Sequence, residues 1–341
     1  MATNELLEST ARAMVAPGKG ILAIDETAGT CTKRFDECRI TSTPASRGAY
    51  RELLLTAPGL GDYISGAILV DETFRQTASD GRSMIDVARG AGILPGIKVD
   101  TGARPLAGAP EETITEGLDH LRERLKEYQQ MGAAFTKWRA VIKIGPGLPT
   151  LRCIAANAHA LGRYAALVQE SGLVPIVEPE LLMSGSHDID LCQEATEEVL
   201  RAVFAELATQ HVLLEGIVLK PNMVTPGAGA PEQASAAQIA DATLATLRRC
   251  VPAAVPGIAF LSGGQTGEEA CERLSLMAGL DDLPWQLTFS FGRALQYPAL
   301  GTWSGSPDNA PAAQADLLHR ARMSSLARCG SYTVQAERAL A

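Results

Sequence analysis

The sequence predicts an α/β fold in which eight parallel strands alternate with helices and close into a (β/α)8 TIM barrel. Three observations lead to this fold. Eight short apolar runs recur along the 341 residues, helix-like stretches separate them, and the first run ends in DETAGT rather than the GxGxxG of a doubly wound sheet. No linker-like change of composition interrupts the alternation, so we expect one domain over residues 1–341, with an N-terminal helix and a short C-terminal tail from about residue 330.

The expected strands are near-continuous apolar runs, as strands buried on both faces of a parallel sheet should be. They cover residues 21–25, 64–71, 92–100, 134–144, 172–179, 211–220, 257–264 and 286–292. The expected helices carry capping signals or apolar residues at helical spacing, and Thr43-Pro44 is the clearest of these starts. They cover residues 44–55, 114–131, 150–170, 193–209, 233–250, 266–279 and 310–328.

Composition excludes several classes of function. The net charge of −9 argues against nucleic acid or an anionic membrane as a partner, although a local basic cluster can still bind an anionic substrate. No segment approaches the roughly 18 apolar residues of a membrane span, and the first residues lack targeting features. The seven scattered cysteines fit a reduced, cytoplasmic protein. The five histidines show no ligand spacing, so we expect no metal.

Charged residues gather where the expected strands end. In a (β/α)8 barrel the active site forms at the carboxyl ends of the strands and in the loops that follow them. A single charged strand end is usually just solvated, but here seven of the eight strands end in groups suited to charge or phosphate. The groups used below are Asp25, Lys98, Glu178, Glu180, Lys220, Ser262-Gly263-Gly264 and Gly292-Arg293.

Lys220 is the least expected of these residues, because it ends an apolar run and is followed by a proline. One interpretation is a lysine whose stem is buried and whose ammonium reaches water. The other is a neutral amine nucleophile, which requires burial or a neighbouring cation to lower the lysine pKa. Lys137 is a candidate for that cation, and Glu178 is a candidate for the acid or base that moves protons.

Lys137 and Arg139 lie two residues apart in the fourth run, so they share one face of the strand. If that face points into the barrel, both cations need carboxylate partners. The carboxylates available at neighbouring strand ends are Asp25, Glu178 and Glu180.

The last two strand ends have the features of phosphate-binding loops. Ser262-Gly263-Gly264 offers backbone N–H groups without bulky side chains and is followed by a helix start at Thr266. Gly292-Arg293 adds a second close approach and a guanidinium. Phosphate sites after the seventh and eighth strands recur in barrels of this kind.

The motifs that carry these residues resemble those of class I fructose-bisphosphate aldolases, the metal-free, Schiff-base type. They are, in chain order, LAIDETAGT, GIKVDTG, FTKWRAVIKI, VPIVEPELL, LLEGIVLKPNMVTPG, FLSGGQT and LTFSFGRALQ, and the resemblance extends to ARCGSYT near the C-terminus. The resemblance implies a glycolytic or gluconeogenic lyase of the (β/α)8 fold. It implies reversible cleavage of fructose 1,6-bisphosphate to dihydroxyacetone phosphate and glyceraldehyde 3-phosphate, without a cofactor, by a homo-oligomer that is often a tetramer.

The resemblance also implies roles for individual residues. Lys220 matches the Schiff-base lysine, and Asp25 matches the carboxylate that takes the C4 hydroxyl proton. Lys137 would keep Lys220 neutral, Glu178 would move protons in the carbinolamine and imine steps, and Glu180 would orient this network. The residues implied for the C1 phosphate are Ser262, Gly263, Gly264, Gly292 and Arg293. Those implied for the C6 phosphate are Lys98, Thr30, Arg34 and Thr27, and Arg139 lines the site.

The C-terminus departs from the family pattern. Many members end in a mobile tail whose last residue is a tyrosine that exchanges a proton at C3, whereas this chain ends in QAERALA at Ala341. The last tyrosine, Tyr332, falls in the stretch that resembles the start of that tail. Either another group protonates the enamine or that step is slow. The short tail is similar to that of bacterial members.

Three alternatives stay open from the sequence. The chain could be another Schiff-base sugar-phosphate aldolase or a transaldolase, which the two phosphate sites disfavour. It could be a catalytically idle scaffold barrel, although such a protein would be expected to lose Lys220, Glu178, Asp25 or Lys137. A metal-dependent aldolase would need clustered histidine ligands, and the sequence has none.

Overall fold

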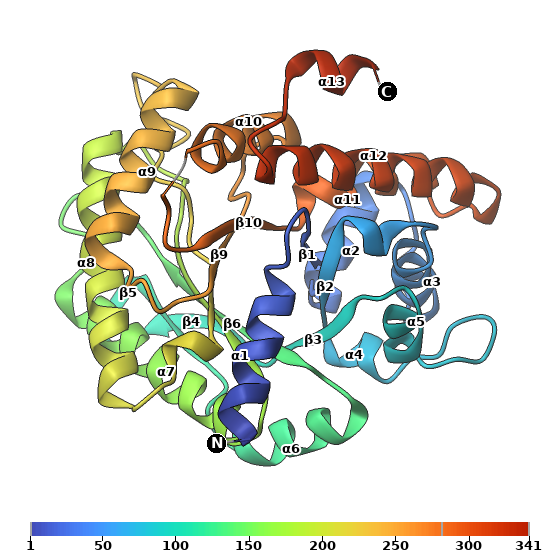
Figure 1. Cartoon of the computed structure of the whole chain (residues 1–341), viewed down its shortest axis with the longest axis horizontal. Helices are drawn as coiled ribbons and strands as arrows, with labels where there is room; N and C mark the ends of the chain where they lie inside the picture. Colours follow the sequence, from blue (N-terminus) through green and yellow to red (C-terminus); the bar gives the residue numbers. More distant parts are fainter. Residues whose placement is uncertain (1, 281, 340–341) are drawn as a thin grey trace.

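The barrel predicted from the sequence is confirmed. The computed structural model describes residues 2–280 and 282–339 and shows a closed barrel of parallel strands surrounded by helices (Figure 1). The order around the barrel is β1-β10-β9-β8-β7-β6-β3-β2, so the first strand pairs with the last. The barrel strands are β1 Gly20–Ala23, β2 Ile64–Leu69, β3 Leu94–Lys98, β6 Phe135–Ile142, β7 Val174–Leu181, β8 Val218–Leu219, β9 Gly257–Phe260 and β10 Gln286–Phe291.

The helices cover the outside of the barrel. The α-helices are α1 Ala2–Met14, α2 Ala28–Glu37, α3 Pro44–Leu55, α4 Asp71–Phe74, α5 Met84–Gly90, α6 Leu121–Met131, α7 Leu151–Glu170, α8 Ile189–Thr209, α9 Ala236–Cys250, α10 Gly267–Ala278, α11 Arg293–Trp303, α12 Ala310–Arg328 and α13 Val334–Ala339. Short 3-10 helices cover η1 Leu60–Asp62, η2 Leu214–Gly216 and η3 Pro307–Asn309. The start predicted for α3 is confirmed, because Thr43 Oγ1 accepts a hydrogen bond of 3.0 Å from Ser46 N and Pro44 follows the cap.

Two sequence-based boundaries differ most from the structure. The helix expected over 114–131 begins only at Leu121, because residues up to Glu116 belong to strand β5 Ala109–Glu116 of a separate antiparallel hairpin with β4 Gly102–Leu106. The strand expected over 211–220 is reduced to Val218–Leu219, because the chain first turns through η2.

The interior of the barrel is apolar at the amino ends of its strands. Apolar side chains of the barrel strands pack into one buried cluster, and they include Ile21, Ala23, Ile68, Phe135, Val174, Ile176, Val218 and Ala259. Helix α1 adds Leu7, Ala11 and Met14 to the same cluster, and it lies across the barrel in Figure 1. This end of the barrel is therefore closed by α1.

Phe135 fills the interior so tightly that its neighbour must be a glycine. A Cβ atom built on Gly96 of the adjacent strand β3 would lie only 2.1 Å from Phe135 Cε2. Ordinary packing does not allow this approach, so the absence of a side chain at Gly96 makes room for the aromatic ring.

The inward faces change from apolar to charged toward the carboxyl ends of the strands. Successive residues on one face of a strand are two apart. Two positions beyond Ala23, Phe135, Ile176 and Val218 the chain carries Asp25, Lys137, Glu178 and Lys220. The alternation that builds the apolar core thus continues directly into the ionisable groups.

Candidate active site

A cleft of about 390 Å³ opens at the carboxyl ends of the barrel strands. Every predicted site residue except Gly264 lines it. These residues are Asp25, Thr27, Thr30, Arg34, Lys98, Lys137, Arg139, Glu178, Glu180, Lys220, Ser262, Gly263, Gly292 and Arg293. Residues far apart in the sequence are thus gathered into one concave site, as expected for this barrel face.

Four ionisable side chains form a connected group at the bottom of the cleft. Lys137 Nζ lies 2.7 Å from Asp25 Oδ2 and 3.1 Å from Glu178 Oε2, and Lys220 Nζ lies 3.3 Å from Glu178 Oε1. Lys137, Glu178 and Lys220 are each only 3% exposed. Charges buried to this degree are tolerated only when they are paired, and the alternation of cations with carboxylates provides the pairing.

The register of β7 and β8 brings Lys220 to Glu178. Val177 and Leu219 are partners in the parallel ladder, and the backbone N–H of Lys220 donates to Val177 O at 2.8 Å. The next residues on the two strands, Glu178 and Lys220, therefore lie side by side and point into the cleft. The lysine does not reach solvent, so the interpretation of Lys220 as a strand-end lysine with an exposed ammonium is wrong.

The two lysines have opposite pKa shifts. Burial lowers the pKa of Lys220 below its ordinary value, Glu178 partly opposes this effect, and the Lys137 cation adds to it. Burial would also lower the pKa of Lys137, but Asp25 and Glu178 outweigh it and raise the pKa above its ordinary value. Lys137 is therefore the permanent cation of the pair, and Lys220 is the one that loses its proton more readily.

The two carboxylates remain ionised. Burial would raise the pKa of Asp25, yet Lys137 and Lys220 together hold it well below its ordinary value. The pKa of Glu178 is lowered in the same way, against burial, by Lys137, Lys220 and Arg139. Both groups are thus available as proton acceptors, and Glu178 is the one in contact with Lys220.

A second group of charges surrounds the first. Arg139 forms an ion pair with Glu180, and Lys98 forms one with Asp100. Asp100 Oδ2 also accepts a hydrogen bond of 3.3 Å from the backbone of Arg139, and its Oδ1 accepts one of 3.1 Å from Gly102. Asp100 therefore orients Lys98 and fixes the start of the β4–β5 hairpin at the rim of the cleft.

The loop after β9 lies partly in the cleft and partly outside it. Gly263 and Gly264 both have positive φ values, +42° and +85°, so consecutive left-handed residues bend the loop after Ser262. Ser262 and Gly263 face the cleft, whereas Gly264 lies with Arg293 in an adjoining cavity of about 310 Å³. The structure therefore places Gly264 outside the cleft, beside Arg293 in the adjoining cavity.

The residues after β1 both line the cleft and form the start of helix α2. Thr27 is the N-cap of α2, and its hydroxyl accepts a hydrogen bond of 3.4 Å from the backbone N–H of Thr30. Both threonines are exposed at the rim. Arg34, in the last turn of α2, lines the cleft on the same side.

Ser290 and Glu26 line the cleft, although sequence reasoning did not select either as a candidate. Ser290 lies on β10, and its hydroxyl is buried without a hydrogen-bond partner among the described residues. The charged strand-end pattern could have identified it, because it directly precedes Phe291-Gly292-Arg293. Glu26 directly follows Asp25 in the chain and was not among the candidates.

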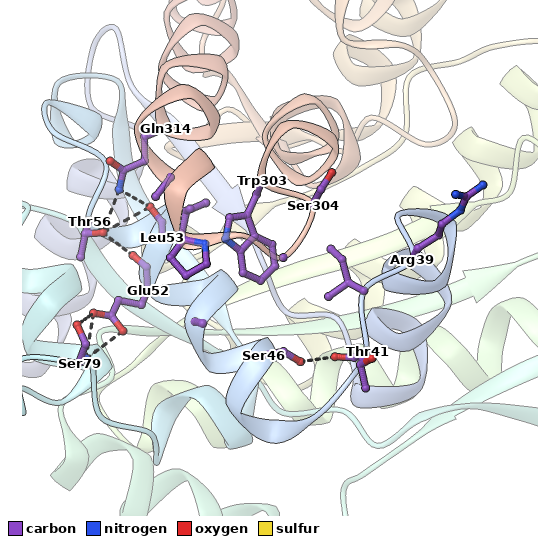
Figure 2. Close-up of a pocket in the computed structure, with 15 residues that line it drawn as sticks. Arg39, Thr41, Ser46, Glu52, Leu53, Thr56, Ser79, Trp303, Ser304 and Gln314 are labelled. Atoms are coloured by element: carbon purple, nitrogen blue, oxygen red, sulfur yellow. Dashed lines mark hydrogen bonds between the residues drawn. The ribbon is translucent and has the colours of Figure 1, made fainter.

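Figure 2 shows a larger cavity, of about 580 Å³, between the loop after α2, helix α3 and the adjoining ends of α11 and α12. Trp303 and Leu53 are among its lining residues, and its one carboxylate, on Glu52, accepts hydrogen bonds from the backbone and hydroxyl of Ser79. No lysine lines it. The cavity therefore lacks the nucleophile and the free base that the strand-end cleft contains.

Three further findings concern metal, membrane and the C-terminus. Over residues 2–280 and 282–339, no group of three or more His, Cys, Asp or Glu side chains is placed to hold a metal ion. No helix in the same ranges is both long and apolar enough to cross a bilayer. Tyr332 is buried, its backbone N–H donates to Ser275 Oγ on α10, and it does not line the cleft; Ala341 lies outside the described residues.

Fold and site together define a class: a (β/α)8 barrel with a buried lysine, of lowered pKa, beside a carboxylate, an arrangement suited to covalent imine chemistry. The comparisons with known proteins agree. The model of the family described as "Fructose-bisphosphate aldolase class-I" matches residues 5–341. The chain therefore belongs to the class I fructose-bisphosphate aldolase family, and it is a lyase of that family.

Similar proteins come from distant organisms. A probable fructose-bisphosphate aldolase class 1 of Xanthomonas campestris pv. campestris is 55% identical over 96% of this chain and 98% of its own length. Fructose-bisphosphate aldolase 1 of Toxoplasma gondii is 52% identical over 99% and 93%. The solved aldolase of Plasmodium falciparum, in complex with TRAP and an inhibitor, superposes with a TM-score of 0.96 at 46% identity, over 97% of this chain and 96% of that one.

Proposed function

We propose that this chain reversibly cleaves fructose 1,6-bisphosphate to dihydroxyacetone phosphate and glyceraldehyde 3-phosphate through an imine on Lys220. The observation that carries the proposal is the contact of 3.3 Å between the buried amine of Lys220 and the Glu178 carboxylate. A neutral amine beside a base is what carbonyl attack requires. The main fact in its support from outside the chain is membership of the aldolase family.

The first half of the reaction forms the imine. Glu178 takes a proton from Lys220, and the neutral amine attacks the C2 carbonyl of the open-chain sugar to give a carbinolamine. Glu178 returns a proton to the C2 hydroxyl, which leaves as water, and the nitrogen becomes an iminium. Lys137, in contact with Glu178 and Asp25, disfavours reprotonation of Lys220 and balances the two carboxylates.

The second half breaks the carbon–carbon bond. Asp25 takes the C4 hydroxyl proton, the C3–C4 electrons move into the iminium, and glyceraldehyde 3-phosphate leaves an enamine on Lys220. Protonation of the enamine at C3 and hydrolysis of the imine then release dihydroxyacetone phosphate. Glu180 acts through Arg139, its ion-pair partner at the wall of the cleft.

The phosphates would bind at opposite sides of the cleft. The C1 phosphate is assigned to Ser262, Gly263, Gly292 and Arg293, and Gly264 contributes only through the shape of its loop. The C6 phosphate is assigned to the rim formed by Lys98, Thr27, Thr30 and Arg34. The cations on both sides suit a substrate with two anionic ends.

The proposal includes no metal, a cytoplasmic location and a homo-oligomer, with a tetramer as the expected assembly. Metal independence is supported by the amine and carboxylates, which supply the nucleophile and the bases. Light scattering coupled to size exclusion measures the mass of the assembly directly.

The deciding experiment traps the imine. The purified protein is incubated with dihydroxyacetone phosphate and EDTA and reduced with borohydride, and the adduct is located by peptide mass. We expect the adduct on Lys220, none in Lys220→Ala, and an unchanged adduct in Lys143→Ala, whose lysine pairs with Glu111 at the surface. No adduct in the unaltered protein, or one that needs added metal, would overturn the proposal.

A substrate assay separates the remaining alternatives. Cleavage of fructose 1,6-bisphosphate with release of free glyceraldehyde 3-phosphate supports an aldolase. Transfer of a three-carbon unit to an acceptor sugar, without such release, would instead indicate a transaldolase. An idle scaffold would show neither reaction.

A further inference from the structure

Glu26 joins three side chains that come from three different helices. Its side chain is only 7% exposed, although it lines the cleft. Oε1 accepts hydrogen bonds from Arg34 of α2 and from Gln296 of α11, and Oε2 accepts one of 2.6 Å from Arg51 of α3. The carboxylate thus sits at the point where these helices meet the loop after β1.

Arg34 is held on two sides. Glu26 binds one Nη atom of the guanidinium, and the ring of Tyr297 on α11 lies 5.8 Å from Arg34 Cζ, a cation–π distance. The Tyr297 hydroxyl donates to Glu37 at 3.2 Å, which fixes the ring. The remaining donors of the guanidinium make no hydrogen bond with described residues and are free for an anion in the cleft.

Gln296 connects this arrangement to the other phosphate-binding arginine. It lies one turn after Arg293 on α11, and its amide donates to Ala23 O at 3.0 Å as well as to Glu26. The hydroxyl of Tyr50 donates to Gln296 Oε1 at 3.0 Å. The Glu26–Gln296 bond therefore links Arg34 on α2 to the helix that carries Arg293.

Arg51 provides the counter-charge for the buried Glu26 carboxylate. Its side chain is 2% exposed, and Glu26 is its one ion-pair partner among the described residues. Two of its nitrogens, Nε and Nη1, have no partner there. Removal of the Glu26 charge would leave a buried guanidinium uncompensated, so a neutral replacement is expected to damage the fold.

We propose that Glu26 is a positioning residue that selects bisphosphate over monophosphate substrates by fixing Arg34 against the C6 phosphate. The proposal rests on the proposed function, because it assumes a sugar substrate with phosphates at both ends. Arg51 supplies the counter-charge for Glu26, and Gln296 sets the position of α2 relative to α11. Glu26 is the one ion-pair partner of Arg34 among the described residues.

The test is Glu26→Asp, which keeps the charge beside Arg51 but is too short by one methylene to reach Arg34 and Gln296 together. Its matched control is Glu72→Asp. Glu72 accepts two hydrogen bonds from Arg47, of 2.8 and 2.6 Å, and does not line the cleft. KM and kcat are measured with fructose 1,6-bisphosphate and with fructose 1-phosphate. We expect KM for the bisphosphate to rise about tenfold, the scale of one charge-assisted hydrogen bond, with KM for the monophosphate and both kcat values little changed.

A double-mutant cycle distinguishes a positioning role of Glu26 from a merely structural one. If Glu26 acts through Arg34, then Glu26→Asp should add no further rise in bisphosphate KM to the variant Arg34→Ala. Equal effects on both sugars, no effect on either, or full additivity with Arg34→Ala would each overturn the proposal. Should Glu26→Asp fail to fold, Gln296→Met is measured in the same way with the same expected selectivity.

Failure of this inference is distinguishable from failure of the proposed function. Imine trapping with dihydroxyacetone phosphate does not use the C6 phosphate, so Glu26→Asp should trap normally on Lys220. If the unaltered protein neither traps nor cleaves, the proposed function fails. If it does both and Glu26→Asp behaves like Glu72→Asp, only the role of Glu26 fails.

Discussion

Lys220 Nζ lies 3.3 Å from Glu178 Oε1, and water reaches almost none of either side chain. An exposed pair at this distance would be an ordinary ion pair of small consequence. Burial makes this pair different, because it disfavours the ammonium form of Lys220 while Lys137 pairs with the Glu178 carboxylate from the other side. The pair is therefore poised to exchange a proton.

The rate of imine formation should depend on pH with a midpoint below that of a free lysine. Only the unprotonated amine attacks a carbonyl, and the pKa of Lys220 is lowered by burial. Stopped-flow measurement with dihydroxyacetone phosphate should show the rise well below pH ~10.4, the ordinary lysine value. In Glu178→Gln the carboxylate that raises this pKa is gone, so the midpoint should fall further while the maximal rate drops by about 10²-fold or more. A midpoint near the ordinary value would contradict the assignment.

Replacement of Lys220 by Met should stabilise the folded protein at neutral pH while abolishing activity. The folded state disfavours the ammonium, so the unfolded state binds more protons between the two pKa values of Lys220. The stability of the unaltered protein should therefore rise with pH in that window, and the advantage of Lys220→Met should shrink toward pH ~10.4. Urea unfolding at pH 7 and 9.5 measures both effects. A variant less stable at pH 7 would contradict this prediction.

Replacement of Lys137 by Met should destabilise the protein and make it more sensitive to acid. The change leaves Asp25 and Glu178 buried with less compensation, which should cost about 3 kcal/mol of unfolding free energy at pH 7. Both carboxylates have lowered pKa values in the fold, so their contribution is present above the unfolded values, ~3.9 and ~4.3, and is lost as pH falls. Without Lys137 these pKa values rise, and the loss should begin at higher pH.

The control for this acid sensitivity is Lys143→Met, because Lys143 pairs with Glu111 at the surface. Its unfolding curves between pH 4 and 7 should follow those of the unaltered protein. Coincident curves for both variants would show that Lys137 does not balance the two carboxylates.

Replacement of Gly96 by Ala should destabilise the barrel through its interior. The new Cβ would meet Phe135 at 2.1 Å, and such overpacking typically costs about 1–3 kcal/mol. Phe135→Leu in the same chain should recover part of the loss, which a double-mutant cycle of urea unfolding measures. Gly301→Ala is the control, because a Cβ there meets no atom within 4 Å, and no destabilisation is expected.

The fold could be predicted from the sequence where a strand or helix has a clear residue pattern. Lys137, Glu178 and Lys220 lie in or at the end of apolar runs whose carboxyl ends meet at one face of the barrel, so their shared location could be predicted. Capping signals served equally well at Thr43-Pro44. The β4–β5 hairpin was not predicted, because the apolar spacing of α6 extends backward to Leu118, which lies between β5 and α6.

Contacts that depend on the closure of the whole barrel left no local signal. Glu26 meets Gln296 only because α11 packs beside the loop after β1, and the two residues are 270 apart in the chain. Gly264 was grouped with Ser262 by adjacency, but it lines the adjoining cavity and not the cleft. Loop direction and helix placement decide such positions, and neither follows from residue type.

The pairing of β1 with β10 has a consequence for how the protein is made. Ile21 and Leu22 pair with Ser290 and Phe291, so the barrel remains an open sheet with two exposed edges until nearly the whole chain has left the ribosome. Contacts of such long sequence separation slow folding. The nascent chain therefore passes through a long interval in which β1 is already synthesised but lacks its partner β10, and during that interval chaperones are the natural protection against edge-to-edge aggregation.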